Sequence, residues 1–149
     1  MANDISTLNH LIEVLNDGKK FYSEASAEVQ RPDLKTLFAQ MATTKSAIAA
    51  DLRTAVVAKD SSKAADTDDG SFAGSLRKAY AEIRTKLSTD KNYAYIAELE
   101  AFEDRILAAF RDAAEKSDDI GVRTIAQRYL PQVLRDHAQM RDMKHARAA

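Results

Sequence analysis

Three polar residues, Lys45, Glu103 and His137, interrupt apolar stripes that otherwise repeat every three or four residues. Such spacing places side chains on one face of a helix, the face that is normally buried. A carboxylate and an imidazole are ligands for transition metals, whereas a lysine beside a glutamate forms an ion pair. The residue types therefore allow either a metal centre or a buried ion pair.

His137 lies in the stretch LPQVLRDHAQMRD, among leucines, a valine and a methionine. A lone histidine at such a position is more often a hydrogen-bonded core residue than a metal ligand. If the chain holds a metal at all, Glu103 and His137 are the residues that we expect to bind it.

Our hypothesis is that Lys45, Glu103 and His137 meet at one level of the core. An isolated buried charge is costly, but a lysine paired with a glutamate and hydrogen-bonded to an imidazole is tolerable. The alternative is that each long side chain bends outward and leaves its charged end in water. The spacing alone leaves both interpretations open.

The stripes predict four long helices, over residues 4–29, 32–59, 90–116 and 119–146. Pro32 suits the first turn of a new helix, and an aspartate before the last segment suits a helix cap. Residues 60–88 contain a polar stretch and then a short amphipathic segment, which predicts a loop followed by a short extra helix. We therefore expect an all-α, antiparallel four-helix bundle whose second and third long helices are joined by a long crossover.

The 149 residues suit one domain, spanning 1–149, with a single core. Lys and Arg number 22 against 23 Asp and Glu, so the basic surface of a nucleic-acid-binding protein is not expected. No apolar stretch approaches the length of a membrane span, so we expect no membrane association. With no cysteine and no secretory leader pattern, a cytoplasmic protein is expected.

Several segments, in their order and spacing, resemble a bacterial ferritin-like four-helix-bundle family of unknown function. They are LNHLIEVLNDGKKFYSEA, DLKTLFAQMA, GSFAGSLRKAYAEI, AELEAFEDRILAAFRDA and LRDHAQMRD. That family is distantly similar to rubrerythrin-like and ferritin-like proteins, which hold two metal ions between their helices. Their ligands are a glutamate from each of two helices and a Glu-x-x-His pair from each of the other two.

Transferred to this chain, the resemblance leaves that ligand set incomplete. Only Glu103 and His137 match ligand positions; the remaining positions fall on residues that do not bind iron, namely Leu15, Lys45, Ile48 and Leu134. The resemblance thus implies a degenerate site with no resident metal and no other cofactor. The ammonium group of Lys45 would then stand where a relative holds a metal ion.

The first interpretation is therefore a non-catalytic bundle that acts as an interaction or stress-associated protein, with an unknown protein partner or as a homodimer. The rival is a metal-binding or oxidase-like protein with a rearranged site formed by Glu103 and His137. A third interpretation is a carrier that binds an apolar ligand between its helices. The stress-related role rests only on the resemblance to ferritin-like proteins.

Overall fold

The computed structural model describes residues 2–60 and 91–148, which form four long helices and no strand. The helices are α1 (Ala2–Glu28), α2 (Pro32–Asp60), α4 (Lys91–Lys116) and α5 (Ile120–Ala148). The expected all-α class with four helices is confirmed. The loop and short extra helix expected over residues 60–88 fall almost entirely outside the described residues.

The ends of the helices follow local sequence signals. Pro32 is the first residue of α2, where its missing N–H group costs no helical hydrogen bond. Asp119 precedes α5, and its Oδ1 atom accepts a hydrogen bond of 2.9 Å from the backbone N–H of Val122. This is the geometry of an N-cap, which satisfies one of the free N–H groups of the first turn.

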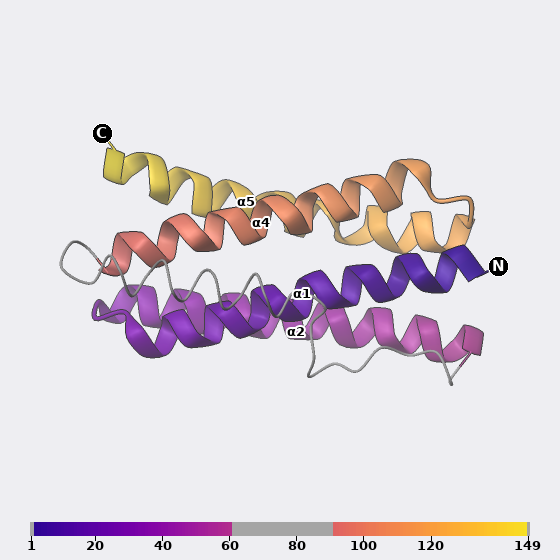
Figure 1. The fold of residues 1–149 in the computed structure, drawn as a ribbon, viewed down its shortest axis with the longest axis horizontal. Helices are drawn as coiled ribbons and strands as arrows, with labels where there is room; N and C mark the ends of the chain where they lie inside the picture. Colours follow the sequence, from indigo (N-terminus) through magenta and orange to yellow (C-terminus); the bar gives the residue numbers. More distant parts are fainter. Residues whose placement is uncertain (1, 61–90, 149) are drawn as a thin grey trace.

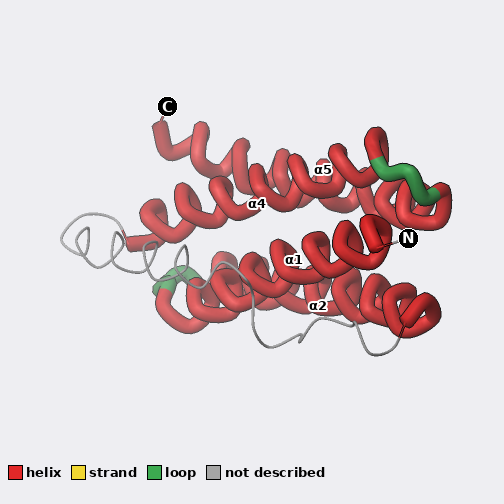
Figure 2. Tube along the Cα trace, turned by 45° about the vertical axis from the view of Figure 1, so that its right-hand side comes forward, coloured by secondary structure: helices red, strands yellow, loops and turns green. Residues whose placement is uncertain are grey.

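The helices are arranged as two hairpins (Figure 1). Short loops join α1 to α2 at one end of the molecule and α4 to α5 at the other (Figure 2). The main packing between the hairpins is that of α1 on α4. The Oδ1 atom of Asn92, at the start of α4, accepts a hydrogen bond of 3.2 Å from the backbone N–H of Gln30, which ties the first short loop to the second hairpin.

The core consists of two apolar clusters separated along the helices. The first apolar cluster takes residues 8–15 of α1, 48–56 of α2, 106–114 of α4 and 122–133 of α5. The second takes residues 21–25 of α1, Val29 of the first short loop, residues 34–42 of α2, 94–102 of α4 and Met140 of α5. Between these ranges every helix has a short interval that contributes to neither cluster. Buried polar residues occupy these intervals.

Gly18 lies in the interval of α1. A Cβ atom built at this position would be 2.9 Å from Cδ1 of Ile106 and 4.0 Å from Cε of Lys45. The missing side chain lets α1 approach α4 closely at this level. The close approach narrows the space around the buried polar residues.

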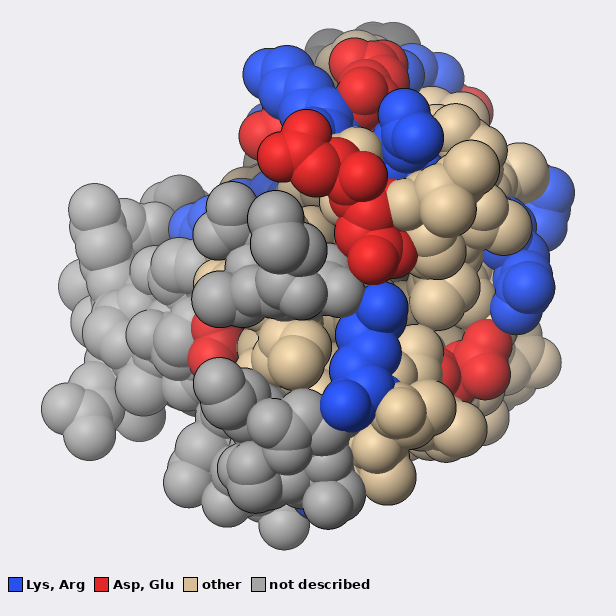
Figure 3. Space-filling model, turned by 90° about the vertical axis from the view of Figure 1, so that its right-hand side faces the viewer, with Lys and Arg blue, Asp and Glu red and all other residues tan. Residues whose placement is uncertain are grey.

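The surface carries mixed charges. At the end of the molecule where α1 begins, Lys and Arg side chains lie next to Asp and Glu side chains over the described residues (Figure 3). This distribution agrees with the net charge of −1. Of the helices described here, none has the length and apolar character needed to span a bilayer.

Candidate functional site: a buried polar cluster between the apolar clusters

One residue from each helix contributes to a polar cluster at the centre of the molecule. These are Tyr22 of α1, Lys45 of α2, Glu103 of α4 and Asp136 of α5, which we call the central cluster. The first three are 0% exposed and Asp136 is 4% exposed. A charged residue this deeply buried is rare unless it is paired, so the contacts inside the cluster determine what it can do.

The ammonium group of Lys45 lies between two carboxylates. Its Nζ atom is 2.7 Å from Oδ2 of Asp136 and 2.9 Å from Oε2 of Glu103. The hydroxyl group of Tyr22 donates a hydrogen bond to the same Oε2 atom of Glu103. The Nζ atom also lies 5.5 Å from the centre of the Tyr22 ring, within range of a cation–π interaction.

A second contact fixes the carboxylate of Asp136 from within its own helix. The side-chain amide of Gln132 donates a hydrogen bond of 2.8 Å from Nε2 to Oδ1 of Asp136. Because Gln132 precedes Asp136 by four residues, both side chains lie on the same face of α5. The two oxygens of Asp136 therefore have different partners, the amide of Gln132 and the ammonium group of Lys45.

With both carboxylates ionised, the central cluster has one positive and two negative charges. Burial raises the pKa of Glu103, and the negative charge of Asp136 adds to this effect, while Lys45 and the Tyr22 hydroxyl oppose it. Burial, together with the charge of Glu103, also raises the pKa of Tyr22 well above its ordinary value. The Oε1 atom of Glu103 has no hydrogen-bond partner. Glu103 is thus the group in the cluster best placed to take up a proton.

His137 is placed differently from Lys45 and Glu103. Its Nε2 atom lies 2.5 Å from Oδ1 of Asp104, and its side chain is 17% exposed. The structure thus brings Lys45 and Glu103 together but pairs His137 with a carboxylate at the rim of the bundle. Asp136, the residue before it, occupies the place beside Lys45.

The spacing did not distinguish these two residues of α5. Asp136 and His137 follow the buried Val133 by three and four residues, and both separations fit a helical stripe. Met140 follows them by four and three residues, so its position does not separate them either. Leu134, which the family resemblance placed at a ligand position, is 38% exposed and does not belong to the core.

Two further ligand positions from the resemblance, one on α1 and one on α2, also lie away from the central cluster. Leu15 and Ile48 are buried in the first apolar cluster. Within residues 2–60 and 91–148, no group of three or more His, Cys, Asp or Glu side chains is placed to hold a metal ion. The cation that the carboxylates of Glu103 and Asp136 contact is the ammonium group of Lys45.

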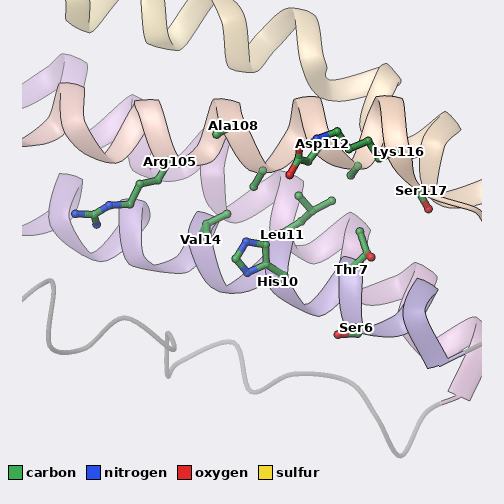
Figure 4. Close-up of a pocket in the computed structure, with 12 residues that line it drawn as sticks. Ser6, Thr7, His10, Leu11, Val14, Arg105, Ala108, Asp112, Lys116 and Ser117 are labelled. Atoms are coloured by element: carbon green, nitrogen blue, oxygen red, sulfur yellow. Dashed lines mark ion pairs between the residues drawn. The ribbon is translucent and has the colours of Figure 1, made fainter.

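A separate groove lies on the surface between α1 and α4 (Figure 4). Its volume is about 660 Å³, and Leu11 and Val14 of α1 contribute apolar walls. Polar side chains from both helices also line it, among them His10 and an ion pair of 3.2 Å between Asp112 and Lys116. The groove borders the first apolar cluster, because Leu11 and Val14 belong to both.

The fold and the central cluster define an all-α protein whose four helices enclose a lysine between two carboxylates. Residues 3–116 match the family model described as Domain of unknown function (DUF2383). The chain therefore belongs to this family. The match ends with α4, so Asp136 lies on a helix that the family model does not cover. No curated protein matches the chain.

Proposed function

We propose that this protein is a ferritin-like, antiparallel four-helix scaffold in which a buried lysine takes the place of the metal ions. The observation that carries the proposal is the position of the Lys45 Nζ atom, 2.9 Å from Glu103 and 2.7 Å from Asp136. Carboxylates from two helices that face one cation form the arrangement that binds metals in bundle cores. Here a side chain of the chain itself supplies the positive charge.

A non-catalytic role follows from this arrangement. An ammonium group has no open coordination position and no redox chemistry, so the centre does not activate oxygen or a bound substrate as a metal would. The cluster instead links all four helices through charge-assisted hydrogen bonds. A scaffold of this kind acts through its surface, on a protein partner or on a second copy of itself, and we assign it to the cytoplasm and to a stress-associated role.

Exposed apolar side chains support self-association, in which the partner is a second copy of the chain. Ile120, at the start of α5, is 73% exposed, and Val57, near the end of α2, is 47% exposed. The adjacent Lys59 and Asp119 join the same parts of α2 and α5 through an ion pair of 3.4 Å. Light scattering should then show a homodimer that Ile120→Lys converts to a monomer.

Metal analysis tests the scaffold proposal against its rival. Protein purified without chelator should contain iron, manganese and zinc at far below one ion per chain. It should also keep its melting temperature when MnCl₂ is added, because the ammonium group of Lys45 already occupies the position between the two carboxylates. One or more tightly bound ions per chain, lost in a Glu103→Gln or His137→Gln variant, would establish the rival metalloprotein.

The groove between α1 and α4 favours a second candidate function, the binding of an apolar ligand. Its volume and its Leu11 and Val14 walls suit a small apolar molecule. Native mass spectrometry should then detect a bound molecule, and the fluorescence of anilinonaphthalenesulfonate should rise on binding. Ala109→Trp, which places a large side chain in the groove, should remove both signals. Unchanged signals in this variant would dismiss the groove as the binding site.

A further inference from the structure

The central cluster holds the two reactants of an amide condensation in contact. The Nζ atom of Lys45 lies 2.7 Å from Oδ2 of Asp136, and the side chains are 0% and 5% exposed. Bulk water has little access to this pair, because the two apolar clusters flank it along the helices. A third ionisable group, Glu103, contacts the same Nζ atom at 2.9 Å. An amine, a carboxyl group and a nearby proton carrier are the groups that amide formation requires.

We propose that Lys45 and Asp136 condense into an intramolecular isopeptide bond between α2 and α5, with Glu103 as the catalytic residue that carries protons. The bond joins Nζ of Lys45 to Cγ of Asp136, and the C–O bond to Oδ2 breaks. The ammonium and carboxylate groups together contain the atoms of one amide and one water molecule. The reaction therefore needs no oxidant or reductant.

The contacts assign a role to each neighbouring group. Glu103 accepts a proton from Nζ, which makes the amine nucleophilic, and it later delivers protons to the departing Oδ2 atom. Its Oε1 atom has no hydrogen-bond partner and is available to carry a proton. The negative charge that develops on Oδ1 of Asp136 is stabilised by the amide of Gln132, 2.8 Å away.

Tyr22 is a positioning residue in this scheme. Its hydroxyl group donates to Oε2 of Glu103, the oxygen that contacts Nζ. The hydrogen bond holds the carboxylate of Glu103 against the amine. The hydrogen-bond partners of the two carboxyl groups identify Asp136 as the one that reacts. Oδ1 of Asp136 has an amide donor that can stabilise its developing charge, whereas Oε1 of Glu103 has none.

Two physical effects favour condensation at this site. Holding the reactants in contact replaces a bimolecular step, and effective molarities in such arrangements reach roughly 10⁵–10⁸ M. The reaction also removes one buried positive and one buried negative charge, whose desolvation is costly even when they are paired. Burial already raises the pKa of Glu103, so this carboxylate is suited to take up a proton from Nζ and pass it on to the departing oxygen.

The product would be a covalent link between the two helical hairpins. Lys45 belongs to the α1–α2 hairpin and Asp136 to the α4–α5 hairpin. The backbones of α2 and α5 have few close contacts, so their side chains provide most of the connection at this interface. A bond at this position would keep the hairpins joined in denaturant.

Intact-mass spectrometry of the denatured full chain provides the test. The wild-type chain should be lighter than its sequence by the mass of one water molecule. After trypsin digestion, the peptide of residues 36–53, uncleaved at Lys45, should be joined to the peptide of residues 136–141. The peptide mapping matters because the sequence also contains an Asp69–Gly70 pair, which loses water when it cyclises to a succinimide.

Variants separate the reaction from a simple ion pair. Lys45→Arg keeps the positive charge but should show the full mass, since a guanidinium group is not an effective nucleophile. Glu103→Gln keeps both reactants and should slow the mass loss during refolding by about 10²–10⁴-fold, the usual contribution of a general acid–base. Asp104→Asn, which changes the exposed neighbour, should react like the wild type.

A wild-type chain with helical circular dichroism and the full mass after prolonged incubation would overturn the inference. So would a mass loss that persists in Lys45→Arg or that maps to Asp69–Gly70. Neither result affects the scaffold proposal, which depends on metal content and needs only the ion pair. Conversely, bound metal in a chain with the isopeptide link would overturn the scaffold proposal and leave the link established.

Discussion

Two pairs of sequence neighbours have opposite surroundings in the structure, namely Glu103 with Asp104 and Asp136 with His137. Glu103 and Asp136 face the core and share the ammonium group of Lys45, whereas Asp104 and His137 contact each other at the rim. One residue along a helix turns the side chain by about 100°. This rotation separates a fully buried carboxylate from Asp104, whose side chain is 58% exposed.

We therefore expect that the surroundings of a polar contact, more than its residue types, determine how much it contributes to stability. Both pairs bring carboxylates to a nitrogen group within hydrogen-bonding distance. At the rim, water solvates each partner when the contact breaks, so the pair contributes little. In the core, loss of one partner leaves a charge without solvent, so the same change is severe.

The largest effect is expected from removal of the buried cation. Lys45→Met keeps most of the side-chain volume but leaves Glu103 and Asp136 facing each other without a positive charge. We expect the free energy of unfolding to fall by about 3–5 kcal/mol, the usual cost of breaking a buried ion pair. Urea denaturation followed by circular dichroism measures this change.

A triple variant serves as the control for this prediction. Lys45→Met combined with Glu103→Gln and Asp136→Asn removes all three charges, so it should recover at least half of the lost stability. Recovery of this kind is the signature of coupled charges. If the triple variant is as unstable as Lys45→Met, the loss comes from packing or from the missing isopeptide bond, and the charge interpretation is wrong.

The second-largest loss of stability is expected when the hydrogen bond from Tyr22 to Glu103 is removed. Tyr22→Phe keeps the aromatic ring but removes the donor, so a buried carboxylate loses a partner. A loss of about 1.5–3 kcal/mol is expected for a hydrogen bond to a charged group. Thermal and urea unfolding would both detect it.

Tyr129→Phe provides the matched comparison for Tyr22→Phe. The hydroxyl group of Tyr129 also donates to a carboxylate on another helix, Asp51, but at an exposed position. Water replaces this bond when it is lost, so the cost should stay below about 1 kcal/mol. Equal losses in the two variants would contradict the role assigned to burial.

The general fold could be predicted because apolar residues repeat with helical spacing along four segments. Pro32 and an aspartate before the last segment, Asp118 or Asp119, also indicated two helix boundaries, and the structure has Asp119 as the cap. The crossover between α2 and α4 could not be assessed in the same way, because most of residues 60–88 lie outside the described part of the chain. The loop and short helix expected over residues 60–88 therefore stay a prediction.

The central cluster was only partly visible in the sequence. Lys45 and Glu103 stand out because each interrupts an apolar stripe and has no equally suitable neighbour. Asp136 was missed because His137 fits the stripe of α5 equally well and has the more distinctive chemistry. Tyr22 could not be predicted as a member, since spacing carries no information on which hydroxyl group meets a carboxylate across the core.

The pH dependence of the free energy of unfolding should distinguish Glu103 from its exposed neighbour Asp104. Burial raises the pKa of Glu103 above its ordinary value of 4.5. Between pH 4.5 and the raised pKa, folded Glu103 keeps a proton that the unfolded chain has released, so its contribution to stability falls as pH rises. Glu103→Gln lacks this titration.

The free energy of unfolding of the wild type relative to Glu103→Gln should therefore decrease with rising pH across that window. The decrease is at most about 1.4 kcal/mol per pH unit. Urea denaturation of both proteins at several pH values measures the difference, in which titrations common to both cancel. A difference that grows with pH would mean that Lys45 and Tyr22 outweigh burial and lower the pKa of Glu103.

The smallest effect is expected at the rim pair. Asp104→Asn removes the charge that His137 contacts, but the side chain of Asp104 is 58% exposed and water compensates for most of the loss. The free energy of unfolding should change by less than about 1 kcal/mol, and added salt should reduce the change further. Asp104 directly follows Glu103 in the sequence. Comparing the free energies of unfolding of Asp104→Asn and Glu103→Gln therefore separates the effect of burial from that of sequence position. A loss at Asp104 comparable to that of Lys45→Met would show that the rim pair, and not the central cluster, joins α4 to α5 energetically.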